Sequence, residues 1–316
     1  MDVGRFGFIV KRLITTVPLL LGIVLLVFLL LKITPGDPAR LAVGLRASDA
    51  EVARARKAMG LDQSAIQQYL SYLWRALHGN LGYSFKSQSL VTQIIGAQAP
   101  VTAWLITFGV IISLVISVPA AVLAATHRDG WWDHAIRGFA VLAVGMPMFW
   151  VGVMLITLVA LPTGWFPVGG FGNTLVDHVR ATVLPGLTLG IAMAPPMIRG
   201  LRISVLEALK SEYVEFGRSL GVRGVRLQRR FVVRNALPPM VTLLAVQSGY
   251  FVFGAVILET VFALPGLGQG MANAAVTRDV PLVQGYTLVF AIAIVFIYLV
   301  ADIVNVMLDP RVAIEG

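Results

Sequence analysis

Long apolar runs alternate with polar segments along the chain, and the runs are too long for strands. Six of them approach or exceed the roughly 20 helical residues that cross about 30 Å of hydrocarbon. We therefore predict an all-α membrane protein with six transmembrane helices, at 13–33, 100–125, 139–161, 182–198, 237–263 and 286–308. Pro195 and Pro196 lie in the fourth run, where they are expected to kink or end the helix.

The longest polar segment, 34–99, shows helical patterns of its own. Ser48 begins a pattern that continues through Ala58 and that Gly60 would end, and a second helix is predicted over 63–77. The second helix carries an apolar stripe of Ile66, Tyr69, Leu70, Leu73 and Leu77. This segment is therefore predicted to be a helical insert after the first span.

Composition and charge agree with a membrane protein and set its orientation. Mean hydropathy is +0.83, with 57% hydrophobic and 13% charged residues, which argues against a soluble domain. The net charge of +9 lies in loops beside apolar runs, so it indicates orientation and not nucleic-acid binding. We place the insert 34–99 and the loop 264–285 on the extracytoplasmic side of the membrane. The N-terminus 1–12, the charged loop 199–236 and the C-terminus 309–316 are placed in the cytoplasm.

Motifs for catalysis, metal binding or ATP binding do not occur in the sequence. The chain has no cysteine and only four scattered histidines, so no metal site is expected. It has neither a G-x-x-x-x-G-K-[ST] phosphate loop nor an H-E-x-x-H or G-x-S-x-G motif. Glu259 and Asp302 are predicted near span ends, unlike the midplane carboxylates expected of an ion-driven secondary transporter. That class and an intramembrane enzyme are the rival interpretations.

The charged loop contains an amphipathic pattern outside the predicted spans. Tyr213, Phe216, Gly217 and Leu220 fall at i, i+3, i+4 and i+7, so they share one helix face that needs a cover. A basic cluster follows, which we expect to anchor the loop at anionic headgroups. Its members are Arg223, Arg226, Arg229, Arg230 and Arg234.

Three stretches resemble the permeases of bacterial ABC importers. Glu215-x-Gly217-x-x-x-Gly221, followed by Leu237-Pro238, is similar to their EAA loop, with Phe216 and Gly217 at the middle alanine positions. The segment 259–268, ETVFALPGLG, resembles a motif of peptide-importer permeases. The insert carries the matching PGDP at 35–38, LDQ at 61–63 and NLGYS at 80–84. The resemblance covers essentially the whole chain and points to the first permease subunit of dipeptide and oligopeptide importers, the DppB/OppB type.

The resemblance implies a type I ABC-importer permease architecture with a cytoplasmic coupling helix at 213–221. In such a helix Tyr213, Phe216 and Leu220 would face an ATPase, and Glu215 would meet one of its basic groups. Gly217 and Gly221 would allow close approach and a turn at the helix end. A helix lying on the lipid surface is the alternative. An outer gate or a simple tight turn is expected at Glu259, Pro265, Gly266, Leu267 and Gly268.

The resemblance also implies the partners and the activity. A second homologous permease would complete the pathway in the bacterial inner membrane. Two ABC ATPase subunits would bind ATP and Mg, and an extracytoplasmic substrate-binding protein would dock on the insert. The chain itself would hold no cofactor and perform no covalent chemistry. The expected function is import of di- and oligopeptides by alternating access, with nickel, glutathione or another peptide-like solute as the alternative cargo.

Overall fold

The computed structural model describes residues 2–33, 37–44, 47–84, 86–222, 224–227 and 234–308. Pro35 and Gly36 of the insert motif, Arg223, Arg229 and Arg230 of the basic cluster, and the C-terminus lie outside these residues. The chain divides into two compact units. Unit 1 comprises 1–12, 103–264 and 296–316, and unit 2 comprises 13–102 and 265–295.

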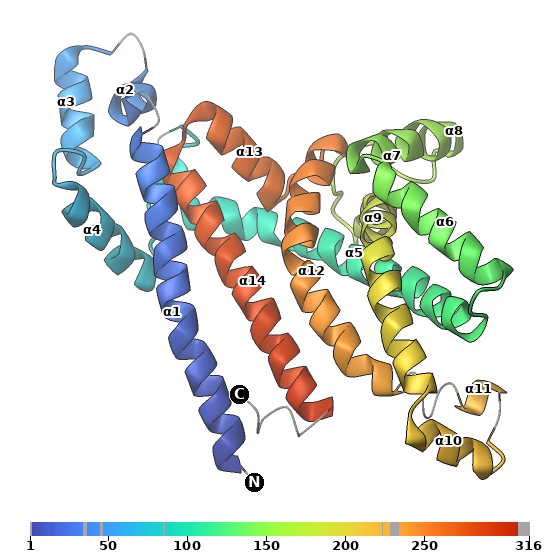
Figure 1. Ribbon diagram of the computed structural model, residues 1–316. Coiled ribbons are helices and arrows are strands. Elements are labelled where there is room, and N and C mark those ends of the chain that lie inside the picture. Colours follow the sequence, from blue (N-terminus) through green and yellow to red (C-terminus); the bar gives the residue numbers. More distant parts are fainter. Residues whose placement is uncertain are drawn as a thin grey trace. The chain divides into compact units, whose positions relative to one another are not determined.

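Helices make up nearly all of the described chain (Figure 1). The first half contains α1 (Asp2–Ile33), α2 (Pro38–Val43), α3 (Asp49–Ala58), α4 (Ala65–Leu77), β1 (Tyr83–Ser84), β2 (Ser89–Leu90), α5 (Val91–Thr126) and α6 (Trp131–Gly145). The second half contains α7 (Met148–Leu155), the π-helix η1 (Ile156–Ala160), α8 (Leu161–Thr163), α9 (Leu175–Leu209), α10 (Glu212–Ser219), α11 (Gly224–Leu227), α12 (Arg234–Val261), α13 (Leu267–Thr277) and α14 (Val280–Leu308). The predicted all-α class is confirmed.

Several helices have the length and apolar composition of membrane spans. Within the described residues these are α5, α9, α14 and Pro238–Val261 of α12. Trp131–Gly145 and Met148–Thr163 together form a fifth candidate, bent by 97° at its break. In α1, the apolar stretch found within the described residues is Val17–Leu29, which is shorter than a full span. Four or five spans are therefore established by length and composition, and the count of six stays a prediction.

The run 139–161 is not the single straight helix that was predicted. Pro147 interrupts it between α6 and α7, because the proline ring disfavours helical geometry at the preceding residue. Met146 accordingly has extended angles, with φ −89° and ψ 121°. The helix before the break begins at Trp131, so Trp131 and Trp132 belong to the first turn of α6 and not to a loop.

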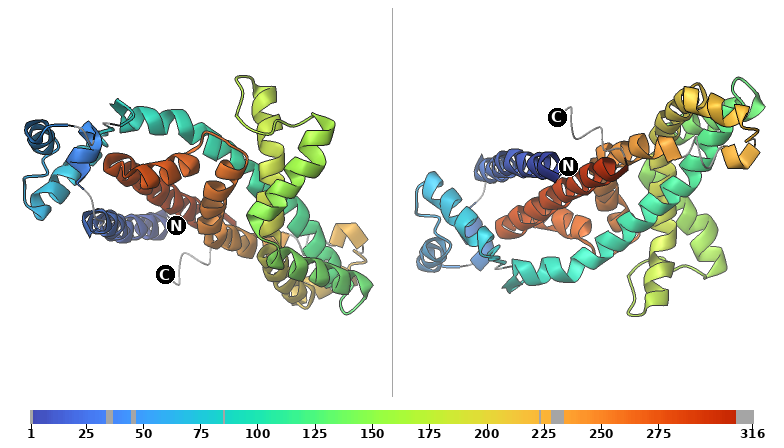
Figure 2. Two further views of the ribbon diagram at one scale, coloured as in Figure 1. Left: turned by 90° about the horizontal axis from the view of Figure 1, so that it is seen from above. Right: turned by 90° about the horizontal axis from the view of Figure 1, so that it is seen from below.

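The fourth run forms one helix, α9, that continues through its prolines. Of the two outcomes expected at Pro195 and Pro196, an end of the helix is excluded, because α9 extends to Leu209. The prolines remove hydrogen-bond donors, but Ala194, Pro195 and Met197 are buried in unit 1. α9 packs along α12 and also contacts α6 and α7 (Figures 1 and 2). Tertiary packing therefore maintains the helix across a sequence that would break an isolated one.

Glycines bring α9 close to its neighbours in unit 1. Gly186 and Gly190, one helical turn apart, lie against α5, where added Cβ atoms would approach Phe108 Cβ to 2.7 Å and Ile112 Cγ2 to 2.6 Å. Gly200 lies against Leu243 of α12 in the same way. Small residues at this spacing allow helix backbones to approach closely in membranes, where packing is the main source of helix association.

Gly190→Ala should destabilise unit 1 by about 2 kcal/mol, because its Cβ would lie 2.9 Å from Ile112 Cβ and 3.0 Å from the Ser113 backbone nitrogen. Thermal unfolding in detergent measures the effect. Gly138→Ala on α6 is the matched control, because no atom lies within 4 Å of its added Cβ. Equal unfolding temperatures for the two variants would contradict the close approach of α9 and α5.

In unit 2, the two helices predicted for the insert are present as α3 and α4. Ser48 and Ser64 are their N-caps, and each forms a capping box with the side chain three residues on. Asp37 caps α2 through the Ala39 N–H at 3.0 Å and pairs with Arg56 at 2.8 Å. Burial acts to raise the pKa of Asp37, but the Arg56 guanidinium and the Ala39 N–H outweigh it, so the pKa lies below 3.8.

The segment 264–285, which was predicted to be a loop, is partly helical. It contains α13 (Leu267–Thr277), which begins after the N-cap Gly266. Asp279 caps the start of α14 and accepts a hydrogen bond from Ser84 of the β1–β2 hairpin. Residues 195 positions apart therefore fix the hairpin of the insert to this segment within unit 2.

Candidate functional site

The segment predicted to be a coupling helix, 213–221, forms the helix α10, which follows directly from the end of α9. Lys210 is the C-cap of α9 and Ser211 is the N-cap of α10, so two cap residues connect the helices. Glu212 and Glu215 lie in the first turn of α10, where negative charge interacts favourably with the helix dipole. An eight-residue helix is too short to be stable alone, so packing must hold it.

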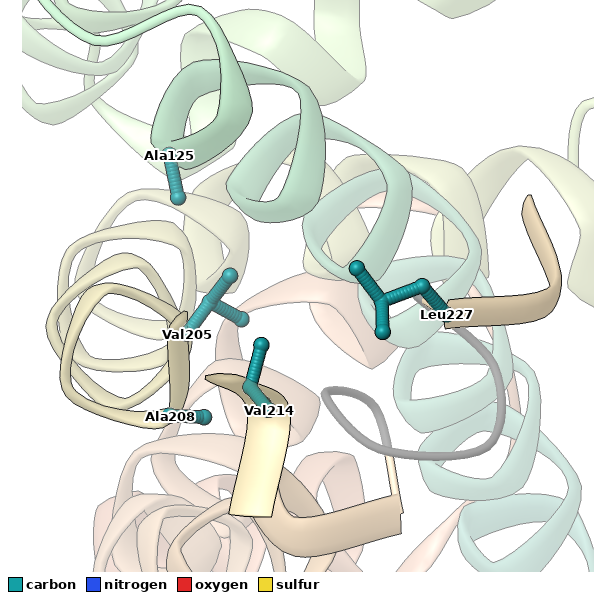
Figure 3. Packing of buried hydrophobic residues seen from close by; sticks show 5 residues of the cluster. All are labelled: Ala125, Val205, Ala208, Val214 and Leu227. Atoms are coloured by element: carbon teal, nitrogen blue, oxygen red, sulfur yellow. The ribbon is translucent and has the colours of Figure 1, made fainter. Parts of the chain in front are cut away.

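One side of α10 packs on unit 1 through Val214 and Gly217, which are both buried. Val214 has no exposed surface and belongs to a hydrophobic cluster gathered from α5, α9, α10 and α11 (Figure 3). The buried members of the cluster are Ala125, Val205, Ala208, Val214 and Leu227. The cluster therefore fixes α10 to the end of α9.

A second apolar side of α10 is uncovered. Tyr213, Phe216 and Leu220 are 40%, 63% and 63% exposed and lie within about 60° of one another around the helix axis. The structure thus separates the four residues predicted to share one face: Gly217 turns toward unit 1, and the other three form an exposed stripe. We call Tyr213, Phe216 and Leu220 the α10 stripe.

Gly221 ends α10 in a Schellman motif. Its φ of +75° is left-handed, Gly221 N–H donates to Arg218 C=O at 2.9 Å, and Val222 N–H donates to Gly217 C=O at 3.1 Å. Val222 then packs on the hydrophobic cluster. The predicted turn at Gly221 is present, and the glycine acts through backbone conformation, because its Cβ position is open.

A buried ion pair connects α9 to α6 close to this cluster. Asp133 has no exposed side-chain surface and accepts from Arg202 Nε at 2.9 Å and from Arg202 Nη2 at 2.7 Å. The Asp129 N–H also donates to Asp133, and Arg137 lies 3.5 Å from it. Arg202 precedes Val205 of the cluster by one turn, so the bidentate pair fixes α9 just above the base of α10.

Sequence patterns did not single out this pair. Asp133 lies between the predicted spans 100–125 and 139–161, and Arg202 lies in the predicted charged loop 199–236. They lie 69 residues apart, and no local spacing relates them. The sequence feature that could have indicated the pair is the carboxylate of Asp133 directly after Trp131 and Trp132. The structure places these residues in the first turn of α6.

The predicted outer gate falls on both units, and each part is described separately. In unit 1, Glu259 lies near the end of α12, as predicted, and its side chain is fully buried. Leu264 N–H donates to Glu259 C=O at 2.8 Å, which closes the helix end around Ala263, with φ +47°. Gly170 N–H donates to Ala263 C=O at 3.1 Å.

In unit 2, the turn residues lead into α13. Pro265 is exposed, whereas Gly266, Leu267 and Gly268 are buried. Leu267 N–H donates to Thr102 Oγ1 at 2.8 Å. These residues form a fixed turn and the first turn of a helix, and a gating role for them stays a prediction.

Within the described residues, no group of three or more His, Cys, Asp or Glu side chains could hold a metal ion. The α10 stripe is an exposed apolar surface outside the candidate spans, so what it can bind is an apolar protein or lipid surface.

Family models assign the chain to a class of transport proteins. Residues 117–314 match the binding-protein-dependent transport system inner membrane component, and residues 5–106 match the N-terminal model of the membrane component of such systems. The chain belongs to this family. The resemblance to ABC-importer permeases inferred from the sequence motifs is confirmed.

Curated relatives match over nearly their whole length. A putative peptide transport system permease protein of Brucella abortus (strain 2308) is 34% identical over 307 residues, covering 96% of this chain and 98% of the relative. The glutathione transport system permease protein GsiC of Pectobacterium atrosepticum is 33% identical over 306 residues, covering 97% and 98%. GsiC of Escherichia coli (strain K12) is 32% identical over the same length.

A solved structure shares the fold. The MetNI methionine ABC transporter in an inward-facing conformation matches with a TM-score of 0.54 at 16% identity, covering 68% of this chain and 96% of that one. At this identity the match concerns the fold alone. It relates the helical arrangement of this chain to that of an ABC transporter.

Asp133→Asn should destabilise the protein by about 3 kcal/mol, because the partly buried Arg202 guanidinium would lose its carboxylate partner. Asp129→Asn is the control, because the Arg128–Asp129 pair is exposed and contributes little. Thermal unfolding in detergent compares the two. If both variants unfold at the same temperature, the Asp133–Arg202 pair contributes no net stability.

Proposed function

We propose that this chain is one permease subunit of an ATP-driven importer of di- and oligopeptides, and that α10 transmits movement from an ATPase subunit. The observation that carries the proposal is the α10 stripe: three apolar side chains are exposed on a helix whose adjacent side is packed against α5 and α9. A helix held in this way can transmit displacement to its own chain, because its base is packed and hydrogen-bonded.

An ATPase groove is a better cover for the stripe than lipid. The stripe is narrow, and Glu212, Glu215 and Arg218 occupy the rest of the exposed helix surface. Acidic side chains are repelled by the anionic surface of the cytoplasmic leaflet, which attracts Lys and Arg. In a protein groove, Glu215 would instead meet a basic group, as the EAA resemblance implies.

We propose a topology of six spans with both termini in the cytoplasm of a bacterial cell. The first span is formed by α1, the third by α6 with α7–α8, and the others by α5, α9, α12 and α14. This topology places α10 and α11 inside and α2–α4, the hairpin and α13 outside. Its support is the charge distribution, since fifteen of the 25 Lys and Arg residues lie in segments assigned to the inside.

The assembly would contain a second homologous permease, two ABC ATPases that bind ATP and Mg, and an extracytoplasmic substrate-binding protein. ATP binding would close the ATPases, α10 would follow, and alternating access would move substrate inward. Peptides are the proposed cargo because relatives named for peptide and glutathione transport have nearly equal identity to this chain. Glutathione is itself a tripeptide, so one pathway chemistry suits both.

Phe216→Asp should abolish ATP-dependent peptide uptake while the permease still inserts, because a carboxylate would replace the most central residue of the α10 stripe. The measurement is uptake of labelled di- and tripeptides into vesicles that contain all candidate partners, together with copurification of the ATPase. Loss of uptake should accompany loss of the ATPase from the complex or ATP hydrolysis without transport.

Ser219→Asp is the matched control, because it adds the same charge to α10 on the exposed polar side. It should transport normally. Gly221→Asp is less informative, since it also strains the left-handed C-cap. If Phe216→Asp transports as well as Ser219→Asp, the coupling role is refuted, and if the wild-type chain alone accumulates substrate on an ion gradient, the importer proposal is refuted.

A further inference from the structure

The exposed stripe on α4 is a second apolar surface that the proposed function does not use. Ile66, Leu70, Trp74 and Leu77 are 72%, 57%, 67% and 82% exposed. They follow one another at i, i+4, i+8 and i+11, so they form one continuous face. Of the apolar stripe predicted from the sequence, Ile66, Leu70 and Leu77 are exposed, whereas Tyr69 and Leu73 are half-buried; the fully buried residue of α4 is Tyr72.

α4 has three distinct sides around its axis, as its residue spacing and exposure show. Tyr69, Tyr72 and Ala76 turn toward unit 2 and are buried or half-buried. The exposed apolar face comes next around the helix. The remaining side is polar, and its members Gln68, Ser71 and Arg75 line a pocket of 400 Å³. A helix with a protein side, an apolar side and a polar side is typical of the boundary between a membrane protein, lipid and water.

The contacts of α4 with α1 set its depth. Tyr69 Oη donates to the Leu21 C=O at 2.8 Å, and the Tyr69 and Phe28 rings lie 5.7 Å apart. Both α1 residues belong to the apolar helix Val17–Leu29. Leu21 precedes the end of α1 at Ile33 by twelve residues, which is about 18 Å of helix. In a bilayer with a hydrocarbon core of about 30 Å, Tyr69 therefore reaches well below the outer boundary.

The α4 face also continues a lipid-facing surface. Leu25, Leu26 and Leu29 of α1 are exposed, as expected of a span in contact with acyl chains. Because Tyr69 of α4 contacts Leu21 and Phe28, the exposed apolar face of α4 lies at the same level along α1 as these leucines. Trp74 lies on the apolar face of α4, which suits the preference of tryptophan for the membrane interface.

We propose that α4 is embedded in the outer leaflet, with Ile66, Leu70, Trp74 and Leu77 among the acyl chains. The inference rests on the proposed topology, in which the insert is outside. It assigns lipid as the partner of this face of the insert, so a substrate-binding protein would dock elsewhere on it. The polar side of α4 then borders water at the pocket.

Site-directed spin labelling tests the proposal, and the absence of cysteine from the chain makes single labels simple to introduce. The complete importer is reconstituted in phosphatidylethanolamine–phosphatidylglycerol vesicles. Labels are placed at Leu70→Cys and Leu77→Cys on the apolar face. Collision rates with oxygen, which concentrates in hydrocarbon, are compared with those of a water-soluble nickel chelate.

Two control labels calibrate the result. Leu26→Cys reports the lipid-exposed surface of α1, and Ser71→Cys reports the exposed polar side of α4. The expected ratio of oxygen to nickel collisions at Leu70 and Leu77 matches that at Leu26 and exceeds that at Ser71 several-fold.

Three results would overturn the proposal. A label at Leu70 that behaves like the label at Ser71 places the face in water. A label shielded from both reagents, or shielded on adding the substrate-binding protein, places it against protein. Either of these first two results leaves the proposed importer topology intact, as long as the label at Leu26 shows the high ratio of oxygen to nickel collisions expected in lipid. If Leu26 itself is accessible to the nickel chelate, the proposed topology fails together with this inference.

Discussion

The continuity of α9 is the constraint on which unit 1 depends. Its 35 residues form one helix about 52 Å long, although three prolines interrupt the hydrogen-bond ladder. Contacts through Gly186 and Gly190 with α5 and through Gly200 with α12 hold it from two sides. Because α10 follows after only Lys210 and Ser211, a displacement of α10 cannot be absorbed by a long flexible linker. It must reach the packed part of α9.

The hydrophobic cluster and the Schellman motif explain why α10 exists before any partner binds. A free eight-residue peptide would be mostly unfolded, so it would lose the conformational entropy of helix formation when it binds its partner. Here Val214 is already buried, and Val222 closes the helix end on the same cluster. The stripe is thus presented in a fixed geometry, and association needs to order little more than three side chains.

Local patterns in the sequence predicted much of the helical structure. The start of α3 at Ser48 and its end before Gly60 follow from capping chemistry, which acts within a few residues. The α10 helix followed from its apolar spacing. The limits came from packing: whether Pro195 ends a helix depends on burial, and periodicity cannot tell which apolar side of α10 or α4 its own chain covers. The Asp133–Arg202 pair depends on the approach of two helices that are distant in the sequence.

The same reasoning accounts for the bend at Pro147. A proline in an apolar run is tolerated in α9, where helices surround it, but produces a 97° bend between α6 and α7. The residues of α6 around the break are mostly exposed, so no packing holds the chain straight there. Whether a proline bends an apolar helix therefore depends on the helices that pack around it, and the apolar sequence alone does not specify these helices.

The α10 stripe also bears on the life of the subunit in the cell. In the proposed importer, Phe216 and Leu220 of a newly inserted permease would be exposed to the cytoplasm until an ATPase covers them, as apolar side chains are in an unfolded protein. Chaperones and proteases that recognise such surfaces would then act on permease subunits made in excess of their ATPases. A surface proposed to transfer energy would in this way also report whether the complex has been assembled in the right proportions.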